Sequence, residues 1–149
     1  LLFPYICMKI NKNNLIVGSN VIIDSTKQCI EIEEIKSDQV KYKNTWIDLE
    51  TLSGIWIDLD IISKLGFIQR HIEMNLRVID DYVLDVNSID NKKSFVISLD
   101  QKDFIKFGVW HLKIEENGIT QLTTDVQYLH ELQGIMGLKN IEICHLVLG

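Results

Sequence analysis

Proline, cysteine and basic charge are all scarce in this chain of 149 residues. It has one proline and three cysteines, and 15 lysines and arginines are outnumbered by 21 aspartates and glutamates, for a formal net charge of −6 at pH 7. One proline and 46% apolar residues exclude collagen-like, low-complexity and disordered chains. At this length folding buries about 68–70% of the surface of the unfolded chain, so a hydrophobic core suffices without disulfides or metals.

Cysteine spacing and the length of hydrophobic runs exclude further classes of protein. The chain has an odd number of cysteines, which lie far apart in the sequence at Cys7, Cys29 and Cys144, and no Cys-x-x-Cys motif occurs. This is neither a disulfide framework nor a zinc ribbon. No apolar run approaches the roughly 18–20 residues that span a bilayer. We therefore expect a cytoplasmic protein with reduced thiols, no bound metal and no cofactor.

The negative charge is concentrated in the middle of the chain. Residues 24–60 hold nine acidic and four basic side chains, and residues 73–103 hold seven and four. This sign of charge argues against a protein that grips nucleic acid mainly by its phosphates. It favours a basic protein partner, and ordinary solubility is the alternative explanation. The acidic residues that we expect to contact such a partner are Glu31, Glu33, Glu34, Asp80, Asp81 and Asp85.

Short alternating segments with two helical stretches predict an α+β fold. We expect one domain over residues 8–149, in which an antiparallel sheet with curled N-terminal strands is covered by two short helices. Residues 1–7 precede Met8, which resembles an ordinary start. We expect residues 1–7 to be disordered or to come from an over-long reading frame.

Strand signals fill most of the chain. The alternation slips at Glu33 and Glu34, which predicts a bulge or a strand end, and glutamates here are expected opposite Lys41 and Lys43. The Asn117-Gly118 pair is a strong hairpin signal. The predicted strands cover residues 21–23, 29–35, 39–43, 45–49, 55–57, 76–86, 95–99, 110–115, 119–122 and 140–148.

Two helices are also predicted. The first covers residues 59–65, with Asp58 as its N-cap and Gly66 at its end. The second begins after Thr124, and Gly134 and Gly137 weaken its C-terminal end. The residues expected on the apolar faces of these helices are Leu59, Ile62 and Leu65, and Val126, Leu129, Leu132, Ile135 and Met136.

Two patterns that involve histidine look catalytic at first sight. His130-Glu131 begins like a zinc-protease motif, but glycine occupies position 134, where the second histidine ligand belongs. Cys144 and His145 are adjacent on a predicted strand, so their side chains point to opposite faces. We therefore interpret His130 as a packed or hydrogen-bonded histidine.

Asp24, Glu34 and Lys36 follow the layout of a large nuclease superfamily, in which carboxylates hold Mg²⁺ and a lysine stabilises developing charge. This spacing is common by chance in a chain with 24% charged residues. A solvated hairpin end is the favoured interpretation, and we assign no catalytic or metal-binding residue. A Mg-dependent nuclease stays an alternative.

The three tryptophans lie in strand patterns, so we expect them in the core. A base-stacking platform needs neighbouring lysines or arginines. Only Lys113, near Trp110, meets that need in the sequence pattern. An RNA-binding accessory module, in which the curled N-terminal sheet holds RNA, is therefore a second alternative.

Residues 57–67 (IDLDIISKLGF) and 128–133 (YLHELQ), with a short opening strand at 17–21 (VGSNV), form a set of anchors. They resemble segments that occur in the same order, at similar spacing, in small uncharacterised proteins of phages and integrated elements of Bacteroidota. The chain departs from that pattern at Gly134 and Gly137, which replace longer helical sequence. The matching residues are caps and core, so the resemblance implies a setting and assigns no functional residue.

The setting implied by the resemblance leads to a hypothesis about function. Accessory genes of phages often encode small acidic proteins that bind and disable a host defence enzyme. We therefore expect a non-enzymatic inhibitor in the cytoplasm of the bacterial host. The most specific form of this expectation is an anti-CRISPR protein. Its expected partner is an RNA-guided nuclease or its RNA-bound complex, with the RNA-targeting type VI-B effector as the sharpest choice. An accessory phage protein with another partner is the remaining alternative.

Overall fold

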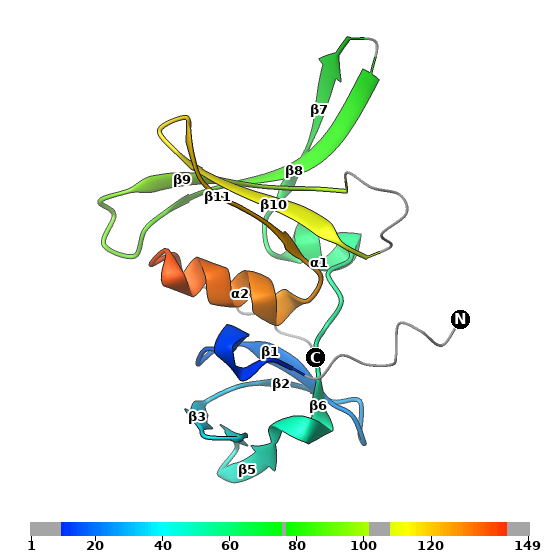
Figure 1. Cartoon of the computed structure of the whole chain (residues 1–149), viewed down its shortest axis with the longest axis vertical. Coiled ribbons are helices and arrows are strands. Elements are labelled where there is room, and N and C mark those ends of the chain that lie inside the picture. Colours follow the sequence, from blue (N-terminus) through cyan, green and yellow to red (C-terminus); the bar gives the residue numbers. More distant parts are fainter. Residues whose placement is uncertain (1–9, 76, 102–107, 143–149) are drawn as a thin grey trace. The chain divides into compact units, whose positions relative to one another are not determined.

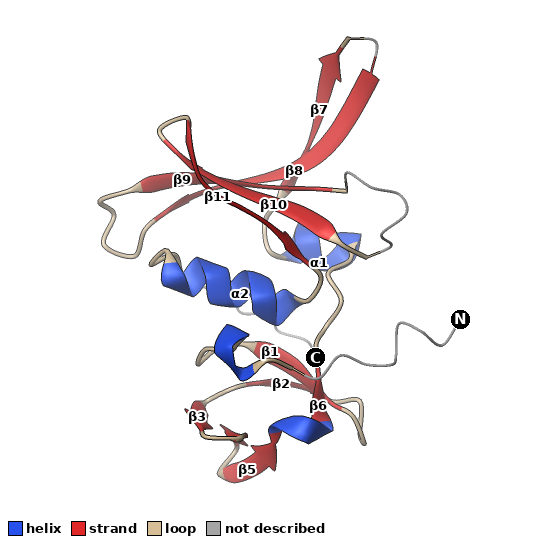
Figure 2. Cartoon of the chain, viewed as in Figure 1, coloured by secondary structure: helices blue, strands red, loops and turns tan. Residues whose placement is uncertain are grey.

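A computed structural model of the chain describes residues 10–75, 77–101 and 108–142. These residues form three antiparallel sheets and two α-helices (Figure 2), which confirms the α+β class. The predictions for residues 1–7, Met8, Cys7, the Cys144-His145 pair and strand positions 143–148 lie outside the described residues. Within the described part of the chain, no helix has both the length and the apolar character needed to cross a bilayer.

Contacts between residues divide the chain into two compact units. The described residues of the first unit fall within Leu1–Trp56 and Tyr128–Leu138, and those of the second within Ile57–Gln127 and Lys139–Glu142. The chain thus leaves the first unit after Trp56 and returns to it at Tyr128. Folding of residues 8–149 as one domain stays a prediction.

The first unit holds two three-stranded antiparallel sheets, with strand orders β2-β1-β6 and β3-β4-β5. The break between β2 and β3 confirms the strand end that the slip at Glu33 predicts. The predicted strand at 55–57 is wrong: Trp56 makes only an isolated bridge to Tyr128, and the Ile55 carbonyl accepts from the Leu129 N–H, 2.8 Å away. The strands are β1 (Asn20–Ile23), β2 (Cys29–Glu31), β3 (Glu34–Lys36), β4 (Gln39–Tyr42), β5 (Thr45–Asp48) and β6 (Leu52–Ser53).

Aliphatic side chains from these strands and from the residues before them form one hydrophobic cluster. Val21 and Val40 are completely buried in it, and Tyr42 packs against it from the side. Two short 3-10 helices, η2 (Lys12–Asn14) and η3 (Leu49–Thr51), belong to the same unit. The buried members of the cluster are Ile10, Leu15, Val21, Ile30, Ile32, Val40 and Leu52.

The second unit contains a five-stranded antiparallel sheet with strand order β11-β10-β9-β8-β7 (Figure 1). Asn117 and Gly118 both have positive φ, 53° and 81°, as a type I′ hairpin turn requires, so the predicted hairpin is confirmed. Strand β7 was not predicted. The strands are β7 (Ile68–Met74), β8 (Arg77–Asn87), β9 (Ser94–Asp100), β10 (Trp110–Glu116) and β11 (Ile119–Val126).

One face of this sheet is apolar and buried. The register pairs Ile97 of β9 with Leu84 of β8 and with Ile114 of β10, so the three side chains lie in one row. Alternation then places every second residue on the same face. The buried residues of β9 and β10 on this face are Phe95, Ile97, Leu99, Trp110, Leu112 and Ile114, as the sequence pattern predicts.

Helix α1 (Leu59–Lys64) begins at the predicted residue and ends one residue before the predicted end. The Asp58 carboxylate accepts a hydrogen bond from the Ile61 N–H at 2.9 Å, and Gly66 has a φ of +96°. The predicted apolar face is wrong at Leu59, which is 58% exposed, because the helix is only six residues long and its first residue projects into solvent. Ile61 is buried in its place, beside Ile62.

Helix α2 (Leu129–Leu138) begins later than predicted, because β11 continues to Val126, which pairs with Trp110 of β10. The Glu131 side chain accepts from the Tyr128 N–H at 2.9 Å and so satisfies a backbone donor at the start of the helix. The predicted apolar face is confirmed at its central positions. The helix residues of that face that are buried are Leu129, Leu132 and Met136.

Candidate functional site

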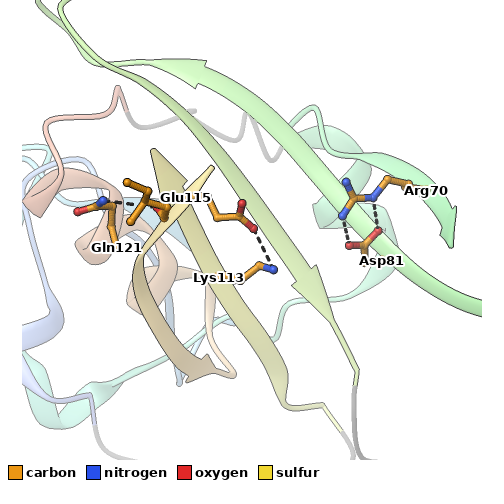
Figure 3. Close-up of polar contacts among 6 residues, drawn as sticks. Arg70, Asp81, Lys113, Glu115 and Gln121 are labelled. Atoms are coloured by element: carbon orange, nitrogen blue, oxygen red, sulfur yellow. Dashed lines mark hydrogen bonds and ion pairs between the residues drawn. The ribbon is translucent and has the colours of Figure 1, made fainter. Parts of the chain in front are cut away.

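The second face of the five-stranded sheet is polar. Because side chains alternate along a strand, the residues between the buried positions of β8 to β11 project from this face. Two of its cations are already paired, as Figure 3 shows: Arg70 with Asp81, and Lys113 with Glu115 at 2.9 Å. Among the residues whose side chains the structure describes, the charged residues and histidine that the register of β8 to β11 places on this face are Asp81, Asp85, Asp100, His111, Lys113, Glu115 and Asp125.

Arg70 of β7 and Asp81 of β8 form a bidentate ion pair on this face. The guanidinium donates from Nε to Oδ1 at 2.9 Å and from Nη2 to Oδ2 at 2.6 Å (Figure 3). The hydrogen bonds to Asp81 raise the pKa of Arg70, and the charges of Asp81, Glu115 and Asp85 add to the effect. Asp81 is only 6% exposed. This predicted contact residue therefore lies buried beneath an internal partner.

The other predicted contact residues of β8 differ from Asp81. Asp80 points to the opposite face, where its carboxylate contacts Nδ1 of His71. Asp85 is exposed on the polar face and lies beside a hollow of about 430 Å³. Of the three acids predicted on this strand, only Asp85 combines exposure with a position on the polar face.

The glutamate cluster lies in the first unit. Glu34 is paired with Lys41 at 2.9 Å, and the hydrogen bond that the Lys41 ammonium donates to the Glu34 carboxylate raises the pKa of Lys41. Glu33 accepts from the backbone N–H of Lys43. These contacts confirm the predicted proximity of glutamates to both lysines. Glu31 is exposed at the end of β2.

An exposed tryptophan with two lysines beside it was missed by sequence reasoning. Trp46 is 38% exposed, and the ammonium groups of Lys36 and Lys41 lie 5.5 and 6.0 Å from the centre of its ring. The expectation that all tryptophans are core is therefore wrong at this position. Trp110 is buried and donates from Nε1 to the Ile57 carbonyl at 2.8 Å, so it offers no stacking surface beside Lys113.

The residues of the nuclease pattern each have another contact. Asp24 accepts from the Ser53 hydroxyl, Glu34 pairs with Lys41, and Lys36 lies over the Trp46 ring. Among the residues that the structure describes, no group of three or more His, Cys, Asp and Glu side chains is placed to hold a metal ion.

His130 of α2 is buried, with 3% of its surface exposed, and its ring stacks on Tyr128 with the centroids 5.8 Å apart. Burial lowers its pKa, and the charge of Glu131 opposes the change only partly. Its Nδ1 atom has no hydrogen-bond partner among the described residues. The interpretation of His130 as a packed histidine is confirmed.

Comparison with known proteins finds no relative of this chain. No family model, curated protein or solved structure matches the chain.

Proposed function

We propose that this protein is a non-enzymatic inhibitor that binds a basic surface of another protein. The polar face of the five-stranded sheet carries the argument, because acids outnumber permanent cations among its described side chains. Arg70 and Lys113 are each already engaged by an acid of the same face. A surface of this sign attracts a basic partner and penalises an acidic one. The acids of this face are Asp81, Asp85, Asp100, Glu115 and Asp125.

The sharper form of the proposal names the partner as an RNA-guided nuclease of a bacterial host, with the RNA-targeting type VI-B effector as first choice. A nuclease that threads RNA presents basic channels, which an acidic surface complements. The resemblance to phage and mobile-element proteins of Bacteroidota supports this setting. We further propose that the protein acts in the cytoplasm of its bacterial host. We also propose that the N-terminal strands form a curled sheet and that the two helices cover the antiparallel sheet.

Affinity capture tests this proposal. The tagged full chain is used as bait in the lysate of a defence-bearing host, with and without RNase, and stoichiometric partners are identified by mass spectrometry. The proposal predicts that a nuclease effector is retained after RNase treatment. Loss of the effector on RNase treatment, or recovery of RNA alone, contradicts direct protein binding.

RNA binding is the second candidate, because Trp46 offers a partly exposed ring with Lys36 and Lys41 beside it. A base would stack on the ring while the lysines contact phosphates, and one such stack is worth about 1–3 kcal/mol. Fluorescence anisotropy of a labelled single-stranded RNA tests this. The candidate predicts salt-dependent binding that Trp46→Ala abolishes. The matched control is Trp56→Ala, because Trp56 contacts the Tyr128 ring at 5.9 Å.

A further inference from the structure

A hollow lies where β8, β9 and the β10–β11 turn meet. It has a volume of about 430 Å³. Its walls combine one carboxylate, hydrogen-bonding amides and a hydroxyl with the apolar residues Val86, Phe95 and Val96. The lining residues that matter for recognition are Asp85, Asn87, Ser94, Val96, Asn117 and Gly118.

Asp85 supplies the negative charge of the hollow. Within the described residues its side chain makes no hydrogen bond or ion pair, although the Arg70 charge lies within electrostatic range. Glu34 and Asp81, by contrast, are each held by an internal cation. A carboxylate without an internal partner gives up no existing ion pair when a cation arrives, so its pairing energy is available for binding.

Val96 supplies an apolar surface next to this charge. It is 36% exposed and pairs across the sheet with Asp85 on one side and with Glu115 on the other. Neighbouring strands are about 4.8 Å apart, so the two acids flank the valine at a distance that a long side chain can cover. An exposed aliphatic group between two acids suits a cation that is carried on a hydrocarbon stem.

The remaining wall is polar and open. Asn87 accepts from the Ser94 hydroxyl at 2.9 Å, which orients its amide. At Gly118 no atom beyond its two chain neighbours lies within 4 Å of the position that a Cβ would take, so this part of the wall has room for an incoming side chain. The hollow thus offers one charge, an oriented amide and an exposed apolar side chain.

We propose that this hollow receives a single arginine or lysine side chain from the protein partner, with the stem on Val96 and the cationic head at Asp85. The inference rests on the proposed function and specifies the contact that carries it. Arginine suits the site best, because its planar head can bond the carboxylate and an amide oxygen together. Removal of the Asp85 charge is expected to weaken partner binding about tenfold or more.

The first test uses the full chain and a defined small probe. Backbone amide shifts are followed by NMR while N-acetylarginine amide is added, with the uncharged analogue N-acetylcitrulline amide as the matched ligand. The inference predicts shifts at Asp85, Val96 and Gly118 for the arginine probe alone, and their loss in Asp85→Asn. Equal shifts from citrulline, or unchanged shifts in Asp85→Asn, overturn it.

The second test measures partner binding, with Asp125→Asn as the control. Asp125 lies on the same face, two strands from Val96, and contacts His111 at 3.2 Å. The inference predicts that a captured nuclease dissociates faster from Asp85→Asn than from Asp125→Asn. Equal retention of that nuclease by both variants overturns the inference and leaves the proposed function standing. Capture of no nuclease by the wild type contradicts the proposed function, while arginine-specific shifts that require Asp85 still support the cation site.

Discussion

Gln133 of α2 and Asn20 of β1 are joined by two hydrogen bonds across 113 positions of sequence. The Asn20 N–H donates to Gln133 Oε1, and Gln133 Nε2 donates to Asn20 Oδ1, both at 2.8 Å. Both residues are almost completely buried. The reciprocal pair therefore ties the returning helix to the first sheet of its unit and satisfies groups that water does not reach.

Replacement of Gln133 by alanine is expected to lower the free energy of unfolding by about 2–4 kcal/mol, because the Asn20 backbone N–H and the Asn20 side-chain oxygen Oδ1 both lose their partner in a buried site. Urea denaturation measures the change. Gln121→Ala is the control, because Gln121 is exposed and, among the described residues, its side chain makes one hydrogen bond, which it donates to the Ile119 carbonyl at 3.4 Å. A cost for Gln133→Ala no larger than that of the control would contradict this role of the pair.

Gly134 permits a close approach of backbone to α2. A Cβ at this position would lie 2.6 Å from the Asn14 carbonyl oxygen, whereas one at Gly137 would meet only the end of the Ile16 side chain, at 2.8 Å. Glycine to alanine inside a helix ordinarily stabilises by about 1 kcal/mol. We expect Gly134→Ala to destabilise instead, by about 1–3 kcal/mol, because backbone cannot move aside as a side chain can. Thermal unfolding that shows Gly134→Ala to be more stable than Gly137→Ala would be the opposite result.

The sequence pattern predicted most of the helices and strands, and it failed where the role of a residue depends on a neighbour that is distant in the sequence. The alternation from Phe95 to Leu99 and the Asn117-Gly118 turn are local signals, and both are confirmed. The glycine at position 134 locally predicts a weaker helix. Its second role, leaving space for the backbone of Asn14, is seen only in the folded chain. Strand β7 was missed because its pairing with β8 is fixed by cross-strand contacts such as that of Arg70 with Asp81.

The same limit applies to the candidate site. Trp46 is five residues from Lys41 and ten from Lys36, and only the register of β3, β4 and β5 brings the three together. The acids of β8 are neighbours in the sequence, yet strand geometry buries Asp81 and leaves Asp85 open. The distribution of charge in the sequence therefore pointed to this strand and could not distinguish a buried acid from an exposed one among its residues.

The buried imidazole of His130 makes stability depend on pH. Because burial lowers the pKa of this histidine in the folded state, the unfolded chain binds its proton more readily. The stabilisation is complete above the ordinary histidine pKa of about 6.5 and is lost as the pH falls below it. Asp90 acts in a more acidic range, because hydrogen bonds from Ser88 and the Lys92 N–H lower its pKa from the usual 3.8.

We expect the free energy of unfolding to fall between about pH 7.5 and about pH 5.5, and to fall less in His130→Gln, which cannot take up the proton. Urea denaturation at several pH values measures both slopes. The control is His71→Gln, since His71 is exposed at its contact with Asp80. Identical slopes in the wild type and His130→Gln would show that this histidine does not control the dependence.

The most direct test of the central claim is inhibition of a purified type VI-B effector loaded with guide RNA. Cleavage of target RNA is followed while the full chain is titrated, with excess unrelated RNA present to remove any effect of simple RNA binding. Direct protein binding predicts that cleavage ends near one inhibitor per effector and that Asp85→Asn needs more protein than Asp125→Asn. Undiminished cleavage at a large molar excess, or inhibition that unrelated RNA abolishes, would contradict the account.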